Sequence, residues 1–232
     1  MLFSSISFLY IFLPIVLLGY YVLPKKLKNG WLLIGSLTFY AFDNPSLLLL
    51  LIPCILMAYI NGFLIHKWRN KVHFFFAILI EAMPLIYFKY TDFFIENANN
   101  LFGLDIKLLK LVLPLGISFY TFQIISYLAD VWMKKSEYEK NFIDLALYVV
   151  CFPQLIAGPI VKYTDFNQQL KNKNISFDNF NKGILIFIVG LGQKVLLANQ
   201  LGELCSKYIV GDSTILFTWM YMIAYSLQIY FD

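Results

Sequence analysis

Long stretches without a charged residue dominate the chain and determine its predicted architecture. No Asp, Glu, Lys or Arg occurs at 1–24, 46–65, 111–129 or 213–231. About 20 consecutive apolar residues are enough for a helix to cross a hydrocarbon core of roughly 30 Å. Runs of this length predict an all-α, polytopic membrane protein.

The boundaries of these runs predict about seven membrane-spanning helices and one further apolar segment. Spans are expected at 8–23, 30–42, 46–65, 72–90, 111–133, 183–206 and from 214 onward. Between the fourth and fifth spans, an interfacial helix or loop is expected at 91–102.

The Lys residues predict how these helices are oriented. Lys25, Lys26 and Lys28 follow the first run, and the basic stretch HKWRNK at 66–71 follows the third. The loops that follow the second and fourth runs are acidic or neutral. Because basic loops remain in the cytoplasm, the chain is expected to start outside and to alternate from there.

The segment 141–161 does not fit a simple alternation. A full crossing would place the following stretch, which holds four Lys at 162–182, outside the cell. The segment is also short, and Pro153 and Pro159 interrupt it. We therefore expect it to enter the membrane from the cytoplasm and to turn back.

Composition excludes several classes of function. Of the 232 residues, 60% are hydrophobic and only 14% are charged, against about a quarter in soluble domains. The net charge of +4 comes from Lys residues between apolar runs, so no basic face for nucleic acid is predicted. The three cysteines lie in or beside apolar runs without a CxxC pair, which favours packing over metal or disulfide chemistry: Cys54, Cys151 and Cys205.

Several polar residues fall inside the apolar runs, where each needs a partner. Glu81 is expected to form a structural ion pair or a hydrogen bond facing a cavity. Lys194 fits a structural and a functional role equally. Buried amides need hydrogen-bond partners, which either neighbouring helices or a hydrated tunnel would supply to Gln123, Gln154 and Gln228. The motifs HExxH, GxSxG, GxGxxG and the Walker loop are absent from the sequence, so the residues alone indicate a multi-span protein with a polar cavity.

Four motifs in order resemble the membrane-bound O-acyltransferase family, and within it the bacterial alginate O-acetyltransferase branch. They are LPLGISFYTFQIISYLADVW at 113–132, CFPQLIAGPIVKY at 151–163, GLGQKVLLAN at 190–199 and YSLQIYFD at 225–232. The resemblance implies N-terminal transmembrane helices at 1–110 and part of an acyltransferase core at 111–232.

The resemblance further implies acyl transfer, most often of acetyl, onto a hydroxyl of an exported polysaccharide such as alginate or peptidoglycan. The implied donor is acetyl-CoA or an acyl carrier, with no bound cofactor or metal, and the implied location is the bacterial inner membrane. Other envelope-modification proteins and membrane lipid are the implied partners. The helices would surround a tunnel, for which the lining candidates are Gln154, Gly158, Lys194, Gln228 and Asp232.

One departure from the family concerns catalysis. The family uses a membrane-embedded His as the base, a role suited to imidazole. That His is expected downstream of Asp232, and neither His66 nor His73 lies in a matching motif. The chain is therefore expected to be an inactive fragment without a catalytic residue. Lys162 also stands where relatives often have Arg, which keeps the charge but loses a bidentate contact.

Two other functions fit the same residues. D-alanyl transfer to teichoic acid would use a carrier protein as donor, and the motifs separate it poorly from acetyl transfer. A glycan or lipid transporter, or an export channel, would share the broken helices and polar residues at membrane depth. The halves of the chain show no self-similarity of the kind that a repeat-built transporter would have.

Overall fold

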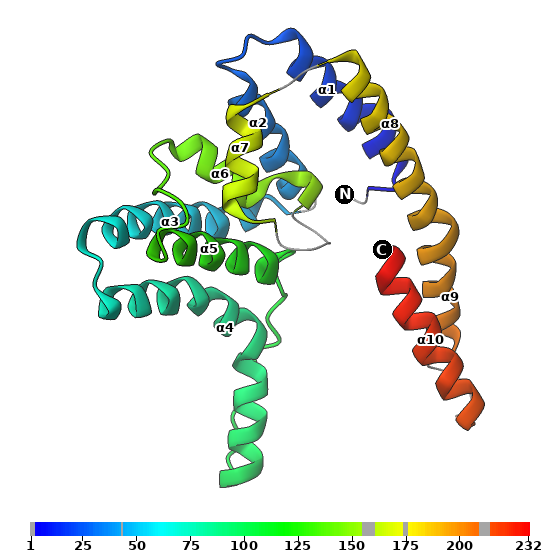
Figure 1. Ribbon diagram of the computed structural model, residues 1–232. Helices are drawn as coiled ribbons and strands as arrows, with labels where there is room; N and C mark the ends of the chain where they lie inside the picture. Colours follow the sequence, from blue (N-terminus) through cyan, green and yellow to red (C-terminus); the bar gives the residue numbers. More distant parts are fainter. Residues whose placement is uncertain (1–2, 43, 155–160, 174–175, 209–213) are drawn as a thin grey trace. The chain divides into compact units, whose positions relative to one another are not determined.

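The computed structural model describes residues 3–42, 44–154, 161–173, 176–208 and 214–232. All regular elements within these ranges are helical, which confirms the all-α prediction. The chain forms two compact units (Figure 1). Unit 1 extends from Pro14 to Asn172, and unit 2 contains Lys173–Asp232 with the N-terminal residues up to Leu13. The division into 1–110 and 111–232 rests on motif content and stays a prediction.

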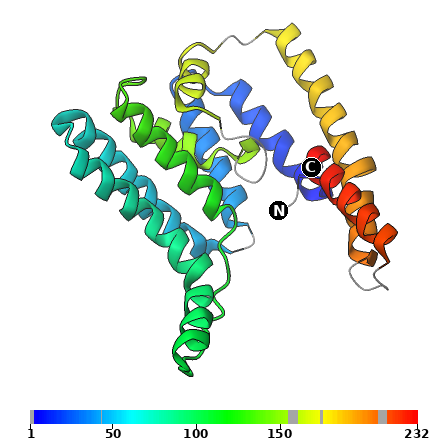
Figure 2. The same cartoon turned by 60° about the horizontal axis from the view of Figure 1, so that its bottom comes forward.

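Unit 1 is a bundle in which α3, α4 and α5 lie side by side and α2 packs on α6, as Figures 1 and 2 both show. Its elements are α1 (Leu13–Val22, shared with unit 2 at its first residue), α2 (Lys28–Ala41), η2 (Pro45–Leu47), α3 (Leu48–Trp68), α4 (Lys71–Phe102), α5 (Ile117–Trp132), α6 (Phe142–Val150), η3 (Phe152–Gln154) and α7 (Tyr163–Lys171).

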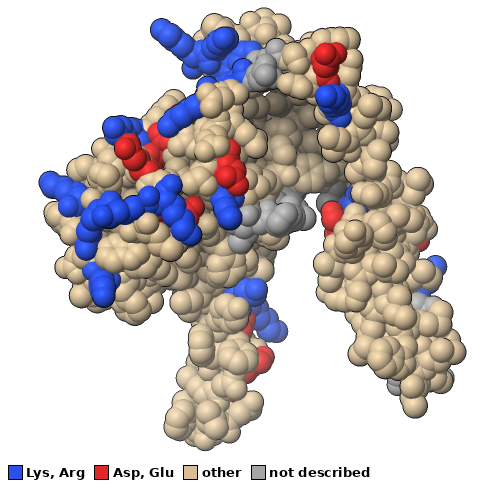
Figure 3. All heavy atoms as spheres, in the orientation of Figure 1, with Lys and Arg blue, Asp and Glu red and all other residues tan. Residues whose placement is uncertain are grey.

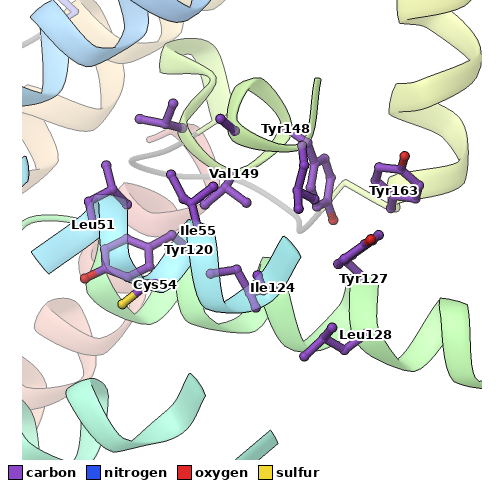
Figure 4. Packing of buried hydrophobic residues seen from close by; sticks show 14 of the residues in the cluster. Leu51, Cys54, Ile55, Tyr120, Ile124, Tyr127, Leu128, Tyr148, Val149 and Tyr163 are labelled. Carbon is purple, nitrogen blue, oxygen red and sulfur yellow. The ribbon is translucent and has the colours of Figure 1, made fainter. Parts of the chain in front are cut away.

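The core of unit 1 forms around α5. Its buried apolar residues recur every three or four positions, the spacing of one helical face. Figure 4 shows Tyr120, Ile124 and Tyr127 of α5 in one cluster with Leu51 and Ile55 of α3 and with buried residues of α6 and α7. Helix α5 is therefore a core helix of the bundle rather than a helix surrounded by lipid.

The prediction of a span at 111–133 was wrong at its start, because α5 begins only at Ile117. Gly116 precedes it with a positive φ of 69°, a conformation that glycine adopts without strain. Residues 104–114 form no regular element and are tied to α4. Both carboxylate oxygens of Asp92 accept backbone N–H groups, from Leu109 at 2.8 Å and Lys110 at 2.9 Å.

Helix α4 differs from the prediction in a similar way. The stretch 91–102 is not a separate element, since α4 continues without a break to Phe102. Gly103, with φ of 64°, ends the helix in the left-handed conformation typical of a C-terminal cap. Pro84 lies inside α4, and Figure 1 shows the helix bending near its middle, where proline removes a backbone hydrogen bond.

Unit 2 contains η1 (Phe8–Phe12), α8 (Phe177–Gly192), η4 (Gln193–Ala198), α9 (Asn199–Tyr208) and α10 (Ile215–Phe231). Helices α8, η4 and α9 form one continuous rod, against which α10 packs along α9 and η4. The hydroxyl of Thr214 caps α10 by accepting the N–H of Phe217 at 3.5 Å. The expected start of the last span near 214 is thereby confirmed.

Three helices in the described part of the chain are long and apolar enough to cross a membrane: Pro45–Trp68, Lys71–Phe102 and Phe177–Lys207. Three shorter apolar helices accompany them: Phe8–Val22, Phe142–Gln154 and Ile215–Phe231. Figure 3 shows Lys and Arg gathered over one part of unit 1, while much of the surface of unit 2 in that view carries no charge. The chain is a helical membrane protein, and the count of seven spans stays a prediction.

Candidate functional site

The described residues of the second motif, 151–154 and 161–163, contact Tyr148 in α6. Helix α6 ends at Val150, so 141–161 is not one continuous helix. The Gln154 side chain donates to the Tyr148 carbonyl at 2.8 Å, and the Tyr148 hydroxyl donates to the Val161 carbonyl at 2.9 Å. The described residues on both sides of 155–160 therefore contact α6. The predicted turn falls on 155–160, outside the described residues, so the turn and its side of the membrane stay predictions.

A buried carboxylate, that of Glu139, lies beside Tyr163 at the end of the motif and is 7% exposed. Its Oε2 accepts from the hydroxyl of Tyr163 and from Asn167 Nδ2 at 3.3 Å, and its Oε1 accepts from the backbone N–H of Asn141 at 3.0 Å. The Glu139 N–H in turn donates to the Tyr127 hydroxyl at 3.0 Å. Both carboxylate oxygens thus have partners, which a buried charge requires.

The network keeps Tyr163 as a hydrogen-bond donor. Burial raises the pKa of the Tyr163 hydroxyl well above its ordinary value, and the hydrogen bond to Glu139 and its negative charge raise it further. The Tyr163 ring also meets the rings of Tyr127 and Tyr148 edge-on, with centroids 4.8 and 5.3 Å apart (Figure 4). Tyr163 therefore joins α7 to both α5 and α6.

A cleft of about 620 Å³ opens beside the network, between the loop after α5 and helix α7. Its lining carries both acidic and basic side chains: Ser136, Glu137, Tyr138, Glu139, Lys140, Thr164, Asn167, Gln168, Lys171 and Asn172. The sequence analysis missed this group because it treated 134–140 only as a basic loop. An acidic residue in a loop with several Lys residues is expected to be exposed, so the sequence does not indicate that Glu139 is buried. Only the fold shows this burial.

In unit 2, the third and fourth motifs meet through an ion pair between Lys194 and Asp232. Lys194 lies in η4, a π-helical turn, and such turns are frequent at functional sites. Gln228, one turn before Asp232, lies against Gly202 of α9. A Cβ built on Gly202 would be 3.0 Å from Gln228 Nε2, so the missing side chain leaves room for the amide.

The structure thus brings together three of the five tunnel candidates, Lys194, Gln228 and Asp232, within unit 2. Gln154 lies in unit 1, where its amide is engaged with Tyr148. Gly158 lies outside the described residues. The role of all five in lining a tunnel stays a prediction.

Glu81 and the two His residues have structural partners. Glu81 is buried and accepts a hydrogen bond from Asn61 at 3.2 Å, and whether it faces a cavity stays a prediction. The rings of His66 and His73 lie against Tyr138 and Trp68, with centroids 4.8 and 5.6 Å apart. Within the described ranges, no group of three or more His, Cys, Asp or Glu could hold a metal ion.

Comparison with known proteins finds a family that resembles this arrangement. The model of the membrane-bound O-acyltransferase family matches residues 134–232, which include Tyr148, Glu139 and the Lys194–Asp232 pair. This part of the chain is therefore similar to the membrane-bound O-acyltransferase family. Three of the four motifs noted in the sequence fall inside the match, and 113–132 precedes it.

Curated relatives match the whole chain. A peptidoglycan O-acetyltransferase of Helicobacter pylori is 33% identical over 270 residues, which cover 100% of this chain and 51% of the relative. A probable alginate O-acetylase AlgI of Pseudomonas aeruginosa is 34% identical over 242 residues, covering 46% of its length. AlgI of Azotobacter vinelandii is 32% identical, covering 48%. The chain therefore spans about half the length of the curated relatives it matches.

Proposed function

We propose that this chain forms part of a membrane-embedded O-acyltransferase that acetylates hydroxyl groups of an exported envelope polysaccharide. The observation that carries the proposal is the similarity of the entire chain to proteins named for O-acetylation of peptidoglycan and of alginate. The ordered motifs support it, because their described residues make the contacts with Tyr148 in unit 1 and the ion pair in unit 2.

The proposed reaction joins a sugar hydroxyl oxygen to the acyl carbon of a thioester. The carbon–sulfur bond of the donor breaks, the thiol leaves, and the hydroxyl proton passes to a base. We propose acetyl-CoA or an acyl carrier as the donor, and the family resemblance implies a membrane-embedded His as the base. His66 and His73 are not assigned this role, since both are packed at the end of the α3–α4 hairpin.

We further propose that the protein lies in the bacterial inner membrane, with α7 and the cleft beside Glu139 on the cytoplasmic side. The Lys residues of the flanking loops support this orientation. A single cysteine introduced at Asn172 tests it. We expect this cysteine to resist a membrane-impermeant thiol reagent in intact cells and to react after the cells are opened. Reaction in intact cells would contradict the orientation.

The test of the reaction uses the complete gene product in a host that lacks its own O-acetyltransferase for the envelope. Base-labile acetate is measured on purified peptidoglycan and on exopolysaccharide, with the wild-type protein and with a variant in which the family His is replaced by Ala. We expect acetate on one glycan with the wild-type protein only. Its absence from both glycans, with the protein present in the membrane, would refute the proposal.

Two further measurements in the same host distinguish the other functions. D-alanyl transfer would release alanine instead of acetate from teichoic acid on mild base treatment. A transporter would change the amount of exported glycan and leave its acetyl content unaltered. Copurification of the membrane protein with other envelope-modification proteins would identify the partners that the resemblance implies.

A further inference from the structure

We propose that one end of unit 1 is a binding surface for the headgroups of anionic phospholipids. This surface, the basic end, consists of residues 67–71 between α3 and α4 and residues 133–140 after α5. Binding of lipid there is separate from acyl transfer, so it is independent of the proposed function.

Two basic residues of this surface have a left-handed backbone. Arg69 follows α3 with φ of 45°, and Lys134 follows α5 with φ of 61°. Helix ends in this conformation usually carry glycine, because a Cβ is sterically unfavourable there. The chain has glycine at the end of α4, where Gly103 has φ of 64°. Arg and Lys at the other two ends are unfavourable for folding, which indicates a role for their side chains.

Backbone hydrogen bonds hold both conformations in place. The N–H of Arg69 donates to the carbonyl of Ile65 at 3.1 Å. After α5, the N–H of Lys135 donates to the carbonyl of Asp130 at 2.9 Å, around the left-handed Lys134. Because these caps use only backbone groups, glycine could form them equally well. The fold therefore does not require a charged side chain at either position.

Aromatic contacts bring the two loops to the same end of the bundle. The ring of Trp132, at the end of α5, stacks on that of Phe74, near the start of α4, with centroids 5.0 Å apart. The Tyr138 ring lies 4.8 Å from that of His66 and 5.5 Å from that of Phe63, both in α3. The two left-handed basic residues therefore belong to one surface.

The exposed charges of the basic end are mostly positive. Its exposed basic side chains are Lys67, Arg69, Lys71, Lys134, Lys135 and Lys140. Of the acidic residues at 130–140, Asp130 and Glu139 are buried and Glu137 is exposed. Figure 3 shows Lys and Arg gathered over this part of unit 1. The surface therefore attracts a negatively charged ligand.

The basic end also lies at a membrane surface. One helix that is long enough to cross a membrane ends at Trp68, and the next begins at Lys71. The Trp68 side chain is 58% exposed, and tryptophan is enriched at the boundary between lipid and water. Groups of about four to eight Lys and Arg residues directly beside a membrane helix are typical of binding to anionic lipid headgroups. An anionic phospholipid therefore matches both the charge and the position of this surface.

Glycine substitutions separate lipid binding from folding. Arg69→Gly and Lys134→Gly each remove a charge and also the steric cost of the left-handed conformation. We expect each variant to raise the folding equilibrium constant in neutral detergent by about twofold to fivefold. Each lost charge should weaken binding of anionic lipid by about fivefold. Opposite changes in stability and in binding distinguish a lipid contact from a structural role.

The matched control is Lys110→Gly. Among the described residues, Lys110 also has a left-handed backbone without being glycine, with φ of 48°. Its N–H donates to Asp92, which lies in the second half of α4 and away from the basic end. This variant therefore loses the same kind of charge and the same steric cost at a different place.

The experiment titrates the complete protein with phosphatidylglycerol in neutral detergent and counts bound lipid by native mass spectrometry. Phosphatidylcholine is the neutral comparison. The variants are Arg69→Gly/Lys134→Gly, Arg69→Asn/Lys134→Asn and Lys110→Gly. Asn also tolerates the left-handed conformation, so the second double variant removes the charges if the first does not fold.

We expect both double variants to bind phosphatidylglycerol roughly 25-fold more weakly than wild type, with Lys110→Gly within about twofold of wild type. The wild-type protein should bind phosphatidylcholine more weakly than phosphatidylglycerol. Unchanged binding in the double variants, or an equal loss in Lys110→Gly, would overturn the inference. Normal lipid binding together with lost affinity for an acidic acyl carrier protein would also overturn it, and would assign the surface to that protein.

Discussion

Neutralising the ion pair between Lys194 and Asp232 should reveal how strongly the third and fourth motifs are coupled. The variants are Lys194→Met, Asp232→Asn and their combination. Each single change leaves one charge without its partner beside an apolar helix, whereas the double change removes both charges. The two side chains are 32% and 39% exposed within the described residues, so the pair is neither fully solvated nor deeply buried.

The expected magnitudes lie between two limits. An exposed ion pair contributes about 0.2–1 kcal/mol, and a lone charge at the centre of a membrane helix costs about 2.5–3.5 kcal/mol. For this intermediate pair, we expect each single variant to lose about 1.5 kcal/mol of unfolding free energy. The double variant should lose about 1 kcal/mol, which gives a coupling energy of about 2 kcal/mol.

The assay is reversible unfolding of the complete protein in bicelles, with the unfolding free energy measured for all four members of the cycle. A control cycle combines Lys194→Met with Glu203→Gln. Glu203 is an exposed acidic residue of α9, and its loss should be additive with that of Lys194. Additive losses for Lys194 and Asp232, within about 0.5 kcal/mol, would show that their contact does not couple η4 to α10.

Two further changes test unit 1. Gly62→Ala should lower the unfolding free energy by about 1–3 kcal/mol, because a Cβ there would lie 2.9 Å from Cε1 of the buried Tyr127 ring. The control is Gly190→Ala, which should be neutral or stabilising because no atom lies within 4 Å of its Cβ. Thermal unfolding of both variants checks this, and equal effects would contradict it. Glu139→Ala should cost about 2 kcal/mol, because Tyr163 loses its buried acceptor. Chemical unfolding measures the loss, and a change below about 0.5 kcal/mol would show that the network contributes little.

The sequence predicted the helices whose limits depend on local signals. The basic loop after Ile65 located the end of α3 well, and the polar stretch before Thr214 located the start of α10. Both limits depend on caps and charges that lie next to the helix in the sequence. The start of α5 was placed too early. Its limit depends on Asp92, whose carboxylate accepts the backbone N–H groups of Leu109 and Lys110 from 17 or 18 residues away.

The candidate site was predicted in the same uneven way. Lys194 and Asp232 were recognisable because a charge in or beside an apolar run is unusual, and the structure shows that they are each other's partner. Glu139 and Tyr148 could not be recognised. Glu139 lies in a charged loop where burial is unexpected, and Tyr148 is one of 16 tyrosines in the chain.

The π-helical turn at Gln193–Ala198 has a consequence for the length of the chain at this point. A π turn closes its hydrogen bonds over five residues rather than four, so it accommodates one residue more than an α-helical turn. Each residue of an α-helix advances the side chains by about 100° around the axis. Deleting one residue within the turn would therefore convert it to an α-helical turn and leave the helix after it in phase, whereas a deletion between the turn and Gly202 would rotate Gly202 away from Gln228. The rod should tolerate the loss of one residue inside the turn but not in the α-helical residues that follow it.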